Sequence, residues 1–228
     1  MAAGTFGSQK TASVTTTVTY HSVPVEVYFS PQDGAMAEVI VQVEAAQTSI
    51  DFAIFFFTED ALRDALIAAH QRGVVIRGLW NALGAGNASS DDETLCAAGI
   101  PIKIEDTAGK MHHKLMIVDA QGSAPTVISD SLNRTAAADN RNSENTIIVH
   151  DAATAQTLAA GFQTLWAGVT AAPCAPEIVQ AERLYLPVVV QADGGAAPAS
   201  SLAKVRKITG LAVCAPTTSL RVGSGDHY

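Results

Sequence analysis

The sequence has 228 residues, of which 48% are hydrophobic and 16% are charged. This composition is typical of a globular chain with a sizeable core and excludes a disordered one. No apolar stretch reaches the roughly 20 residues that a bilayer-spanning helix needs. Residues 1–168 hold 18 acidic and 9 basic side chains, a balance of −9 within a total of −8. This balance argues against a broad nucleic-acid surface, which needs Lys and Arg, but leaves room for a local basic pocket.

Two residue patterns bear on cofactors and location. Three cysteines, Cys96, Cys174 and Cys214, are too few and too scattered for a disulfide scaffold, and their spacing is not that of a zinc site. The first ten residues lack the basic residues and the following apolar run of a secretory signal. The sequence as given therefore carries no address, and secreted and cytoplasmic locations both stay open.

Hydrophobic patterning separates an arm, a region of strands and helices, and a tail. Residues 1–22 are rich in Ser, Thr, Ala and Gly and are expected to form a flexible arm. Alternating or continuous apolar runs predict strands over 25–29, 49–57, 74–80, 100–105, 111–119, 126–129 and 146–150. Apolar residues at helical spacing predict helices over 35–47, 61–71, 91–98 and 152–166.

Strands and helices alternate along the chain, which predicts an α/β fold. We expect a mixed, largely parallel sheet with helices on both faces, because the apolar run 49–57 is typical of a strand covered on both sides. A single domain over 23–168 is predicted. Residues 169–228, interrupted by Pro173 and Pro176, are expected to be a poorly ordered or fragmentary tail.

The stretch Met111-His112-His113-Lys114 is the most informative for chemistry. Because strand residues alternate between faces, His112 and Lys114 are expected on one face and His113 on the other. An imidazole beside an ammonium group costs free energy unless an anion lies there. A metal site at the two histidines is not expected, since adjacent strand residues diverge and lysine is no ligand.

Polar residues downstream could complete a phosphate site. Ser131 and Asn133 stand two residues apart, and Glu144 precedes the strand 146–150. With His112 and Lys114 they supply a potential nucleophile, a cation, neutral donors and a carboxylate that could orient an imidazole. Plainer interpretations exist: a strand histidine is usually a satisfied polar group, Glu144 could be a surface charge and Ser131 a turn residue.

The spacing His112-x-Lys114-x4-Asp119, followed by Ser131-x-Asn133 and Glu144-Asn145, resembles the HKD motif of the phospholipase D superfamily, in its single-motif bacterial-type form. The similarity covers roughly residues 24–168. It implies a phospholipase D-like fold and a phosphodiesterase in which the motif histidine attacks phosphorus and forms a phosphohistidine. A second histidine, from another copy of the motif, would protonate the leaving alkoxide and then activate water. The resemblance implies no metal and no other cofactor.

The same resemblance gives each matching residue a role. His112 is nucleophile or general acid, and Lys114 and Asn133 hold phosphate oxygens, with Ser131 as a further donor. Glu144 would accept a hydrogen bond from the far ring nitrogen of a His112 and so fix its tautomer.

Two further implications concern assembly and the motif's surroundings. Only one copy of the motif is present, so we expect either two chains paired about a two-fold axis, with both His112 rings at one phosphate, or a chain that is half of a longer protein. Asp119 is expected to brace the site without touching substrate.

The pattern departs from the family at two positions. Members usually have Gly before the Ser-x-Asn triplet and an aromatic residue after it, whereas this chain has Asp130 and Arg134. An inward Asp130 would weaken binding of an anion, and Arg134 could compensate by donating to the phosphate. The run Phe55-Phe56-Phe57 is expected to lie in the core.

Three functions follow from the sequence. The leading one is hydrolysis of a phosphodiester in a phospholipid headgroup. The alternatives are a metal-independent endonuclease on DNA or RNA, disfavoured by the charge of −9, and a catalytically impaired scaffold module, which Asp130 favours.

Overall fold

The structure is a computed structural model that describes residues 16–107 and 109–170. Within these residues the chain forms the following helices and strands: β1 (Thr16–Tyr20), β2 (Val23–Phe29), α1 (Ala35–Ala45), β3 (Ser49–Ile54), α2 (Asp60–Gln71), β4 (Val75–Asn81), α3 (Ala82–Ala85), α4 (Asp92–Ala97), β5 (Ile102–Glu105), β6 (Lys114–Val118), β7 (Thr126–Asp130), α5 (Ala136–Asn140), β8 (Asn145–Val149) and α6 (Ala152–Gly168).

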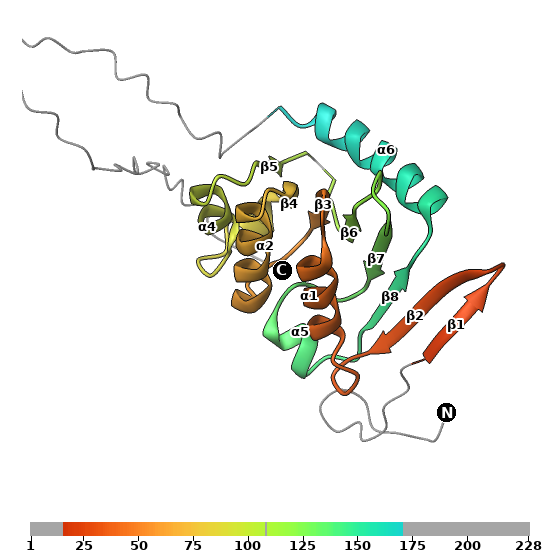
Figure 1. The fold of residues 1–228 in the computed structure, drawn as a ribbon. Coiled ribbons are helices and arrows are strands. Elements are labelled where there is room, and N and C mark those ends of the chain that lie inside the picture. Colours follow the sequence, from red (N-terminus) through yellow and green to blue (C-terminus); the bar gives the residue numbers. More distant parts are fainter. Residues whose placement is uncertain (1–15, 108, 171–228) are drawn as a thin grey trace, which may run out of the picture. The chain divides into compact units, whose positions relative to one another are not determined.

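The strands form one mixed sheet in the order β1-β2-β8-β7-β6-β3-β4-β5 (Figure 1). The predicted mixed α/β sheet is confirmed, but the expectation that it is largely parallel is wrong. The pairs β3–β4 and β4–β5 are parallel, and the other five neighbouring pairs are antiparallel. The crossovers through α2 and α4 return the chain in the parallel sense, whereas the short connection 119–125 between β6 and β7 reverses it.

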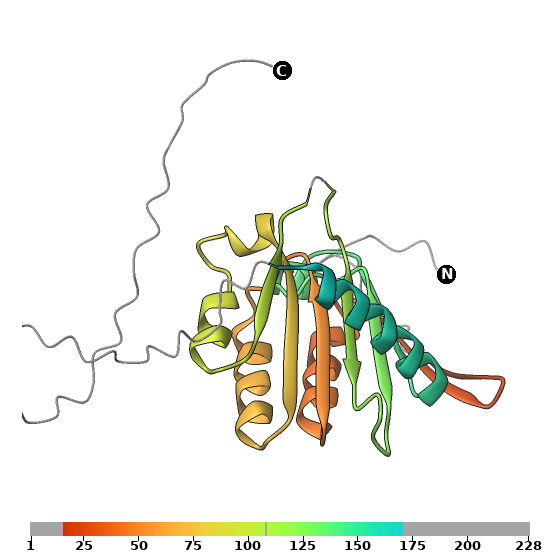
Figure 2. The same ribbon diagram turned by 90° about the horizontal axis from the view of Figure 1, so that it is seen from above.

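Helices cover both faces of the sheet, as predicted. On one face α1 and α2 enclose a core that includes Phe52 of β3 and Trp80 of β4, whose ring centroids are 5.8 Å apart. On the other face α6 packs through Phe162 against residues of β3, β6 and β7 (Figures 1 and 2). On the face covered by α1 and α2, Gly78 of β4 leaves room for the Phe52 ring, because a Cβ atom at Gly78 would lie 2.4 Å from that ring.

The N-terminal boundary differs from the expected one. Residues 16–20 form β1, which pairs with β2, although the whole of 1–22 was expected to be a flexible arm. The run of Thr and Val in β1 favours a strand, because β-branched side chains fit a pleated sheet. Residues 1–15, and the expected tail from 171 onward, lie outside the described residues. Across 16–107 and 109–170, no helix combines the length and apolarity needed to cross a bilayer.

Candidate active site

All the predicted site residues except Asp119 lie at one edge of the sheet, where strands begin or end. β6 begins at Lys114, which pairs with Ile54 at the end of β3. β7 ends at Asp130, which pairs with Thr146 near the start of β8. Because these neighbours run antiparallel, starts and ends of strands meet at the same edge. The loop before β6, the turn after β7 and the segment before β8 therefore converge there.

His112 and Lys114 are in contact. The Lys114 Nζ atom lies 3.2 Å from each ring nitrogen of His112 and 3.3 Å from its carbonyl oxygen. Lys114 is 7% exposed, whereas His112 is at the surface. The structure thus brings the two side chains together as expected, although β6 begins at Lys114 and His112 lies just before it. Because both ring nitrogens are equally close, the contact does not assign the tautomer.

The electrostatic surroundings favour a neutral imidazole at His112. Burial, followed by the charges of Lys114, Lys110 and His113, lowers the pKa of His112 below its ordinary value of 6.5. A nitrogen that attacks phosphorus must carry a free lone pair. The environment therefore favours the form that a nucleophile needs.

Anionic groups lie close enough to Lys114 to affect its charge. The pKa of Lys114 is lowered, because burial outweighs the charges of Asp130 and Glu144, which act to raise it, and the charge of Arg134 adds to the lowering. The two carboxylates therefore offset only part of the cost of burying the ammonium group.

Phe55 belongs to the site, although its place in an apolar run predicted a core residue. The centroid of its ring lies 4.6 Å from that of His112, and Lys114 Nζ lies 5.3 Å from the Phe55 centroid. Phe57 is a core residue as predicted, but Phe55 and Phe56 are only half-buried, so their assignment to the core is wrong. The reason is that β3 ends at Ile54 and the aromatic run continues past the covered part of the sheet.

The turn after β7 carries Ser131 and Asn133. The Asn133 Oδ1 atom accepts a hydrogen bond from the Phe56 backbone N–H at 3.3 Å, so its NH₂ group is turned to donate elsewhere. Arg134 N donates to Phe56 O at 3.0 Å, and Thr58 N donates to Arg134 O at 2.7 Å. These bonds fix the turn to the segment that follows β3, which also carries Phe55.

Glu144 lies at the same edge but is not in contact with His112 of its own chain. Its carboxylate accepts hydrogen bonds from Ser131 Oγ and, at 3.1 Å, from Asn142 Nδ2. Ser30 N donates to Glu144 O at 3.1 Å and holds the backbone there. The expected hydrogen bond from a His112 ring to Glu144 stays a prediction, for an assembly with a second chain.

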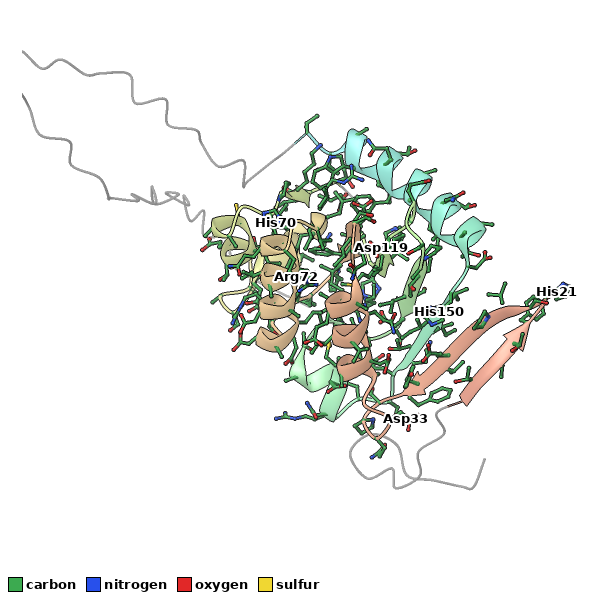
Figure 3. All side chains as sticks on the ribbon, viewed as in Figure 1. His21, Asp33, His70, Arg72, Asp119 and His150 are labelled. Atoms are coloured by element: carbon green, nitrogen blue, oxygen red, sulfur yellow. The ribbon has the colours of Figure 1, made fainter. Side chains whose placement is uncertain are left out.

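Asp119 follows the end of β6 opposite to Lys114, about 17 Å from Lys114 at the rise of an extended strand. Its side chain is labelled in Figure 3. The carboxylate accepts backbone hydrogen bonds from Gln47 at 2.8 Å, Thr48 at 2.7 Å and Ser49 at 2.9 Å. Burial alone would raise the pKa of Asp119, but these donors outweigh it and lower the pKa. The expectation that Asp119 braces the site is therefore wrong, since it braces the connection between α1 and β3.

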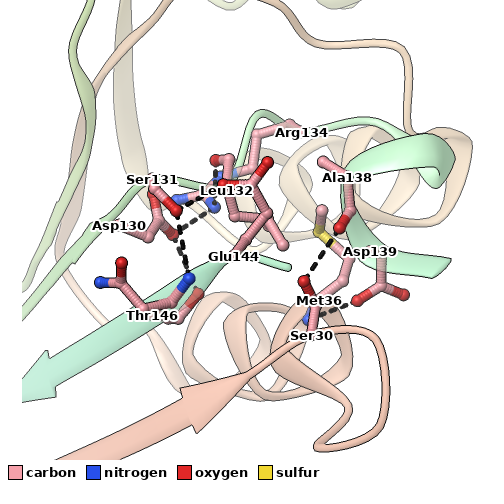
Figure 4. A network of polar contacts seen from close by, with 11 residues as sticks. Ser30, Met36, Asp130, Ser131, Leu132, Arg134, Ala138, Asp139, Glu144 and Thr146 are labelled. Carbon is pink, nitrogen blue, oxygen red and sulfur yellow. Dashed lines mark hydrogen bonds and ion pairs between the residues drawn. The ribbon is translucent and has the colours of Figure 1, made fainter. Parts of the chain in front are cut away.

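Asp130 and Arg134 form a buried ion pair. Arg134 Nη1 lies 2.5 Å from Asp130 Oδ2, and the two side chains are 2% and 0% exposed. The Thr146 hydroxyl also donates to Asp130 Oδ2, at 3.5 Å (Figure 4). The expectation that Arg134 could donate to a phosphate is therefore wrong, because its guanidinium is buried and paired with Asp130.

Within residues 16–107 and 109–170, no group of three or more His, Cys, Asp or Glu side chains is placed to share a metal ion.

Comparisons with known proteins place this geometry in a family. A family model described as cardiolipin synthase, PLD-like domain, matches residues 39–166, which is more than half of the chain. The mitochondrial cardiolipin hydrolase of Xenopus laevis is 31% identical over 134 residues, which are 59% of this chain and 62% of that protein. A phospholipase D of Rickettsia typhi is 31% identical over 157 residues, which are 66% of this chain and 73% of that protein.

A solved structure agrees with these relatives. The crystal structure of Nuc from Salmonella typhimurium, a phospholipase D family member, matches with a TM-score of 0.59 and 29% identity, over 64% of this chain and 96% of that one. The chain spans less than two thirds of the length of the Xenopus relative. The matched segment 39–166 contains the whole cluster from His112 to Glu144. The chain therefore belongs to the phospholipase D superfamily, as its motif predicted.

Proposed function

We propose that this chain is a phosphodiesterase that hydrolyses the headgroup phosphodiester of a phospholipid through a phosphohistidine intermediate. The observation that carries the proposal is the buried Lys114 ammonium, held 3.2 Å from the His112 ring. Asn133 follows β7 at the same edge, and because its Oδ1 accepts from the Phe56 N–H, its NH₂ group can donate to a phosphate. A phosphate bound there would have oxygens next to Lys114 and Asn133. Preorganised donors of this kind stabilise the charge of a phosphoryl group while a nearby nitrogen attacks it.

The chemistry takes two steps. In the first, a nitrogen of His112 attacks phosphorus, the N–P bond forms, and the P–O bond to the leaving group breaks. The leaving oxygen takes a proton from His112 of a second chain. In the second step that imidazole takes a proton from water, the water oxygen attacks phosphorus, and the N–P bond breaks. The two imidazoles carry out every proton transfer, one to the leaving oxygen and one from water, and the proposal includes no metal ion.

The proposal includes a dimer, because one chain supplies one motif histidine. His112 lies at the surface, at the sheet edge, where the imidazole of a second copy can approach the same phosphate. Glu144 of one chain would then accept a hydrogen bond from a ring that must carry a proton. A monomer with full activity, measured by light scattering during the assay, would overturn this part.

A lipid is favoured over a nucleic acid by charge and by the relatives' names. Neutralising a nucleic-acid backbone needs several Lys or Arg side chains along a track. Here the Arg134 guanidinium is already paired with Asp130, and residues 1–168 carry a balance of −9. Two relatives are named cardiolipin hydrolase and phospholipase D. Endonuclease activity is the second candidate, because the superfamily's mechanism would act on any phosphodiester.

An inactive scaffold is disfavoured by the position of Asp130. Its side chain is buried and paired with Arg134, so the carboxylate is not presented to an incoming anion. The departure from glycine therefore does not by itself block the site.

The test offers vesicles of labelled phosphatidylcholine, vesicles of cardiolipin and supercoiled plasmid DNA, each in the presence of EDTA. Release of headgroup or phosphatidic acid is expected. Nicking of DNA alone would replace the lipid with a nucleic acid, and silence on all three would leave a binding module. Activity that EDTA abolishes would contradict the metal-free mechanism.

A pair of neighbouring histidines provides the variant and its control. His112→Asn should abolish activity, whereas His113→Asn, which changes an exposed imidazole one residue away, should retain it. Equal loss in both variants would contradict the assignment of His112.

A further inference from the structure

We infer that the Asp130–Arg134 ion pair is the positioning device of the phosphate-binding turn, and that both residues act as one unit to place Asn133 against substrate. The inference rests on the proposed function, since it assigns these residues a role in the same site. It makes Asp130 and Arg134 positioning residues and not catalytic ones.

The ion pair closes the turn from the inside. Asp130 is the last residue of β7, and Arg134 follows the triplet Ser131-Leu132-Asn133, so the pair brackets the turn that carries Asn133. Arg134 Nη1 also donates to Leu132 O at 3.4 Å, within the bracketed triplet. Figure 4 shows Asp130 and Arg134 meeting beside Leu132, with Thr146 on the other side of the carboxylate.

Each partner is anchored to a different part of the site. Asp130 pairs with Thr146 of β8 and accepts a hydrogen bond from the Thr146 hydroxyl. Arg134 is bonded through its backbone to Phe56, the residue whose N–H also holds Asn133. The ion pair therefore connects β8 with the segment after β3, and a shift in the pair would move Asn133 relative to Lys114.

The charges of the pair also reach Lys114. Burial raises the pKa of Asp130, and the charge and hydrogen bond of Arg134 act against this and favour the carboxylate. The carboxylate in turn stabilises the Lys114 ammonium. Without Arg134, Asp130 would have Lys114 as its remaining cationic neighbour, and the ammonium would be drawn away from a phosphate.

Stability alone is a poor reason for this pair. A buried ion pair is often no more stabilising than well-packed apolar residues of the same volume. This one also leaves Asp130 Oδ1 and Arg134 Nη2 buried without a hydrogen-bond partner, where an Arg–carboxylate pair can form two bonds. The geometry of the Asp130–Arg134 pair fits a role in positioning the turn better than a role in stabilising the fold.

The test uses Asp130→Asn, Arg134→Met and the double variant, all assayed well below their unfolding temperatures. The readouts are KM and kcat with bis(4-nitrophenyl) phosphate and the affinity for inorganic phosphate. Each single variant is expected to raise KM and weaken phosphate binding by about tenfold. The double variant should have a KM no higher, and a phosphate affinity no lower, than the more impaired single variant, because both residues act through one contact.

A second ion pair provides the matched control. Arg77 and Asp51 are joined at 2.8 Å across β3 and β4, away from the turn. Asp51→Asn should lower the unfolding temperature and leave KM and phosphate affinity unchanged. This separates loss of positioning from general loss of stability.

Several outcomes would overturn the inference. One is a folded single variant with wild-type KM and phosphate affinity, and another is a double variant whose effects multiply. If the single variants do not fold, the double variant decides, because it leaves no unpaired buried charge, and a wild-type KM there refutes the inference. If the unaltered protein cleaves no phosphodiester, the proposed function fails, and phosphate binding in the same variants still decides the inference.

Discussion

Replacing Asp119 by alanine removes the carboxylate that ties the connection between α1 and β3 to the end of β6. It accepts hydrogen bonds from the backbone N–H groups of Gln47, Thr48 and Ser49 and from the Thr48 hydroxyl. A hydrogen bond to a charged group contributes roughly 1.5–3 kcal/mol, and bonds that share one acceptor do not add. We expect Asp119→Ala to lower the free energy of unfolding by about 3 kcal/mol.

Asp119→Asn separates shape from charge. Asp119 has a φ of 50°, which asparagine tolerates and alanine does not. An Asn oxygen at the Oδ1 position keeps three of the four bonds and loses the one from Gln47. The expected loss for Asp119→Asn is therefore smaller, about 1–2 kcal/mol.

The stabilisation by Asp119 also depends on pH. The pKa of Asp119 is lowered in the folded protein, so its contribution is complete above the unfolded value of about 3.9. It is lost as the pH falls through the lowered pKa of the folded state. The difference between the unaltered protein and Asp119→Asn should thus shrink below about pH 4.

Urea unfolding followed by circular dichroism at neutral and acid pH measures these differences. An Asp119→Ala loss below about 1 kcal/mol, or a difference that grows in acid, would refute the reasoning. KM and kcat should be unchanged in the folded variants, because Asp119 lies at the other end of β6. A raised KM in a fully folded Asp119 variant would show that Asp119 does brace the active site, contrary to what its hydrogen bonds indicate.

Two further predictions concern the site. Gly84→Ala puts a Cβ atom 1.7 Å from Phe55 O, so α3 and Phe55 must shift, and kcat/KM should fall about 100-fold. Gly161→Ala, where nothing lies within 4 Å of the added Cβ, should keep wild-type kcat/KM, and equal kcat/KM in the two variants would contradict the packing. Lys114→Met removes a charge that lowers the pKa of His112, so that pKa, followed by NMR, should rise toward 6.5. An unchanged or lower value would contradict the contact between the two side chains.

The contact between His112 and Lys114 could be predicted from sequence because it is local. Two residues that are two positions apart at the start of a strand share a face, whatever the rest of the sheet does. The grouping of Ser131, Asn133 and Glu144 with His112 and Lys114 rested on the order of polar residues and on the family motif, and not on periodicity.

Other features could not be read from the sequence, for identifiable reasons. A continuous apolar run indicates that a strand is buried on both faces. Antiparallel strands such as β6 and β7 are buried in the same way, so an apolar run does not predict whether a strand is parallel or antiparallel to its neighbour. Phe55 looks like a core residue because only the end of β3 at Ile54 separates covered from uncovered positions. The Asp130–Arg134 pair depends on β8 and on the segment after β3, which are distant in sequence.

The role of His112 as nucleophile is tested most directly by trapping the covalent intermediate. The protein is mixed with bis(4-nitrophenyl) phosphate, quenched with base within milliseconds to seconds, and its peptides are analysed by mass spectrometry. We expect a 4-nitrophenyl phosphoryl group on His112 that disappears as turnover ends and is absent from His112→Asn. An active, folded protein that shows no such adduct, or carries it on Ser131, would contradict the proposed mechanism.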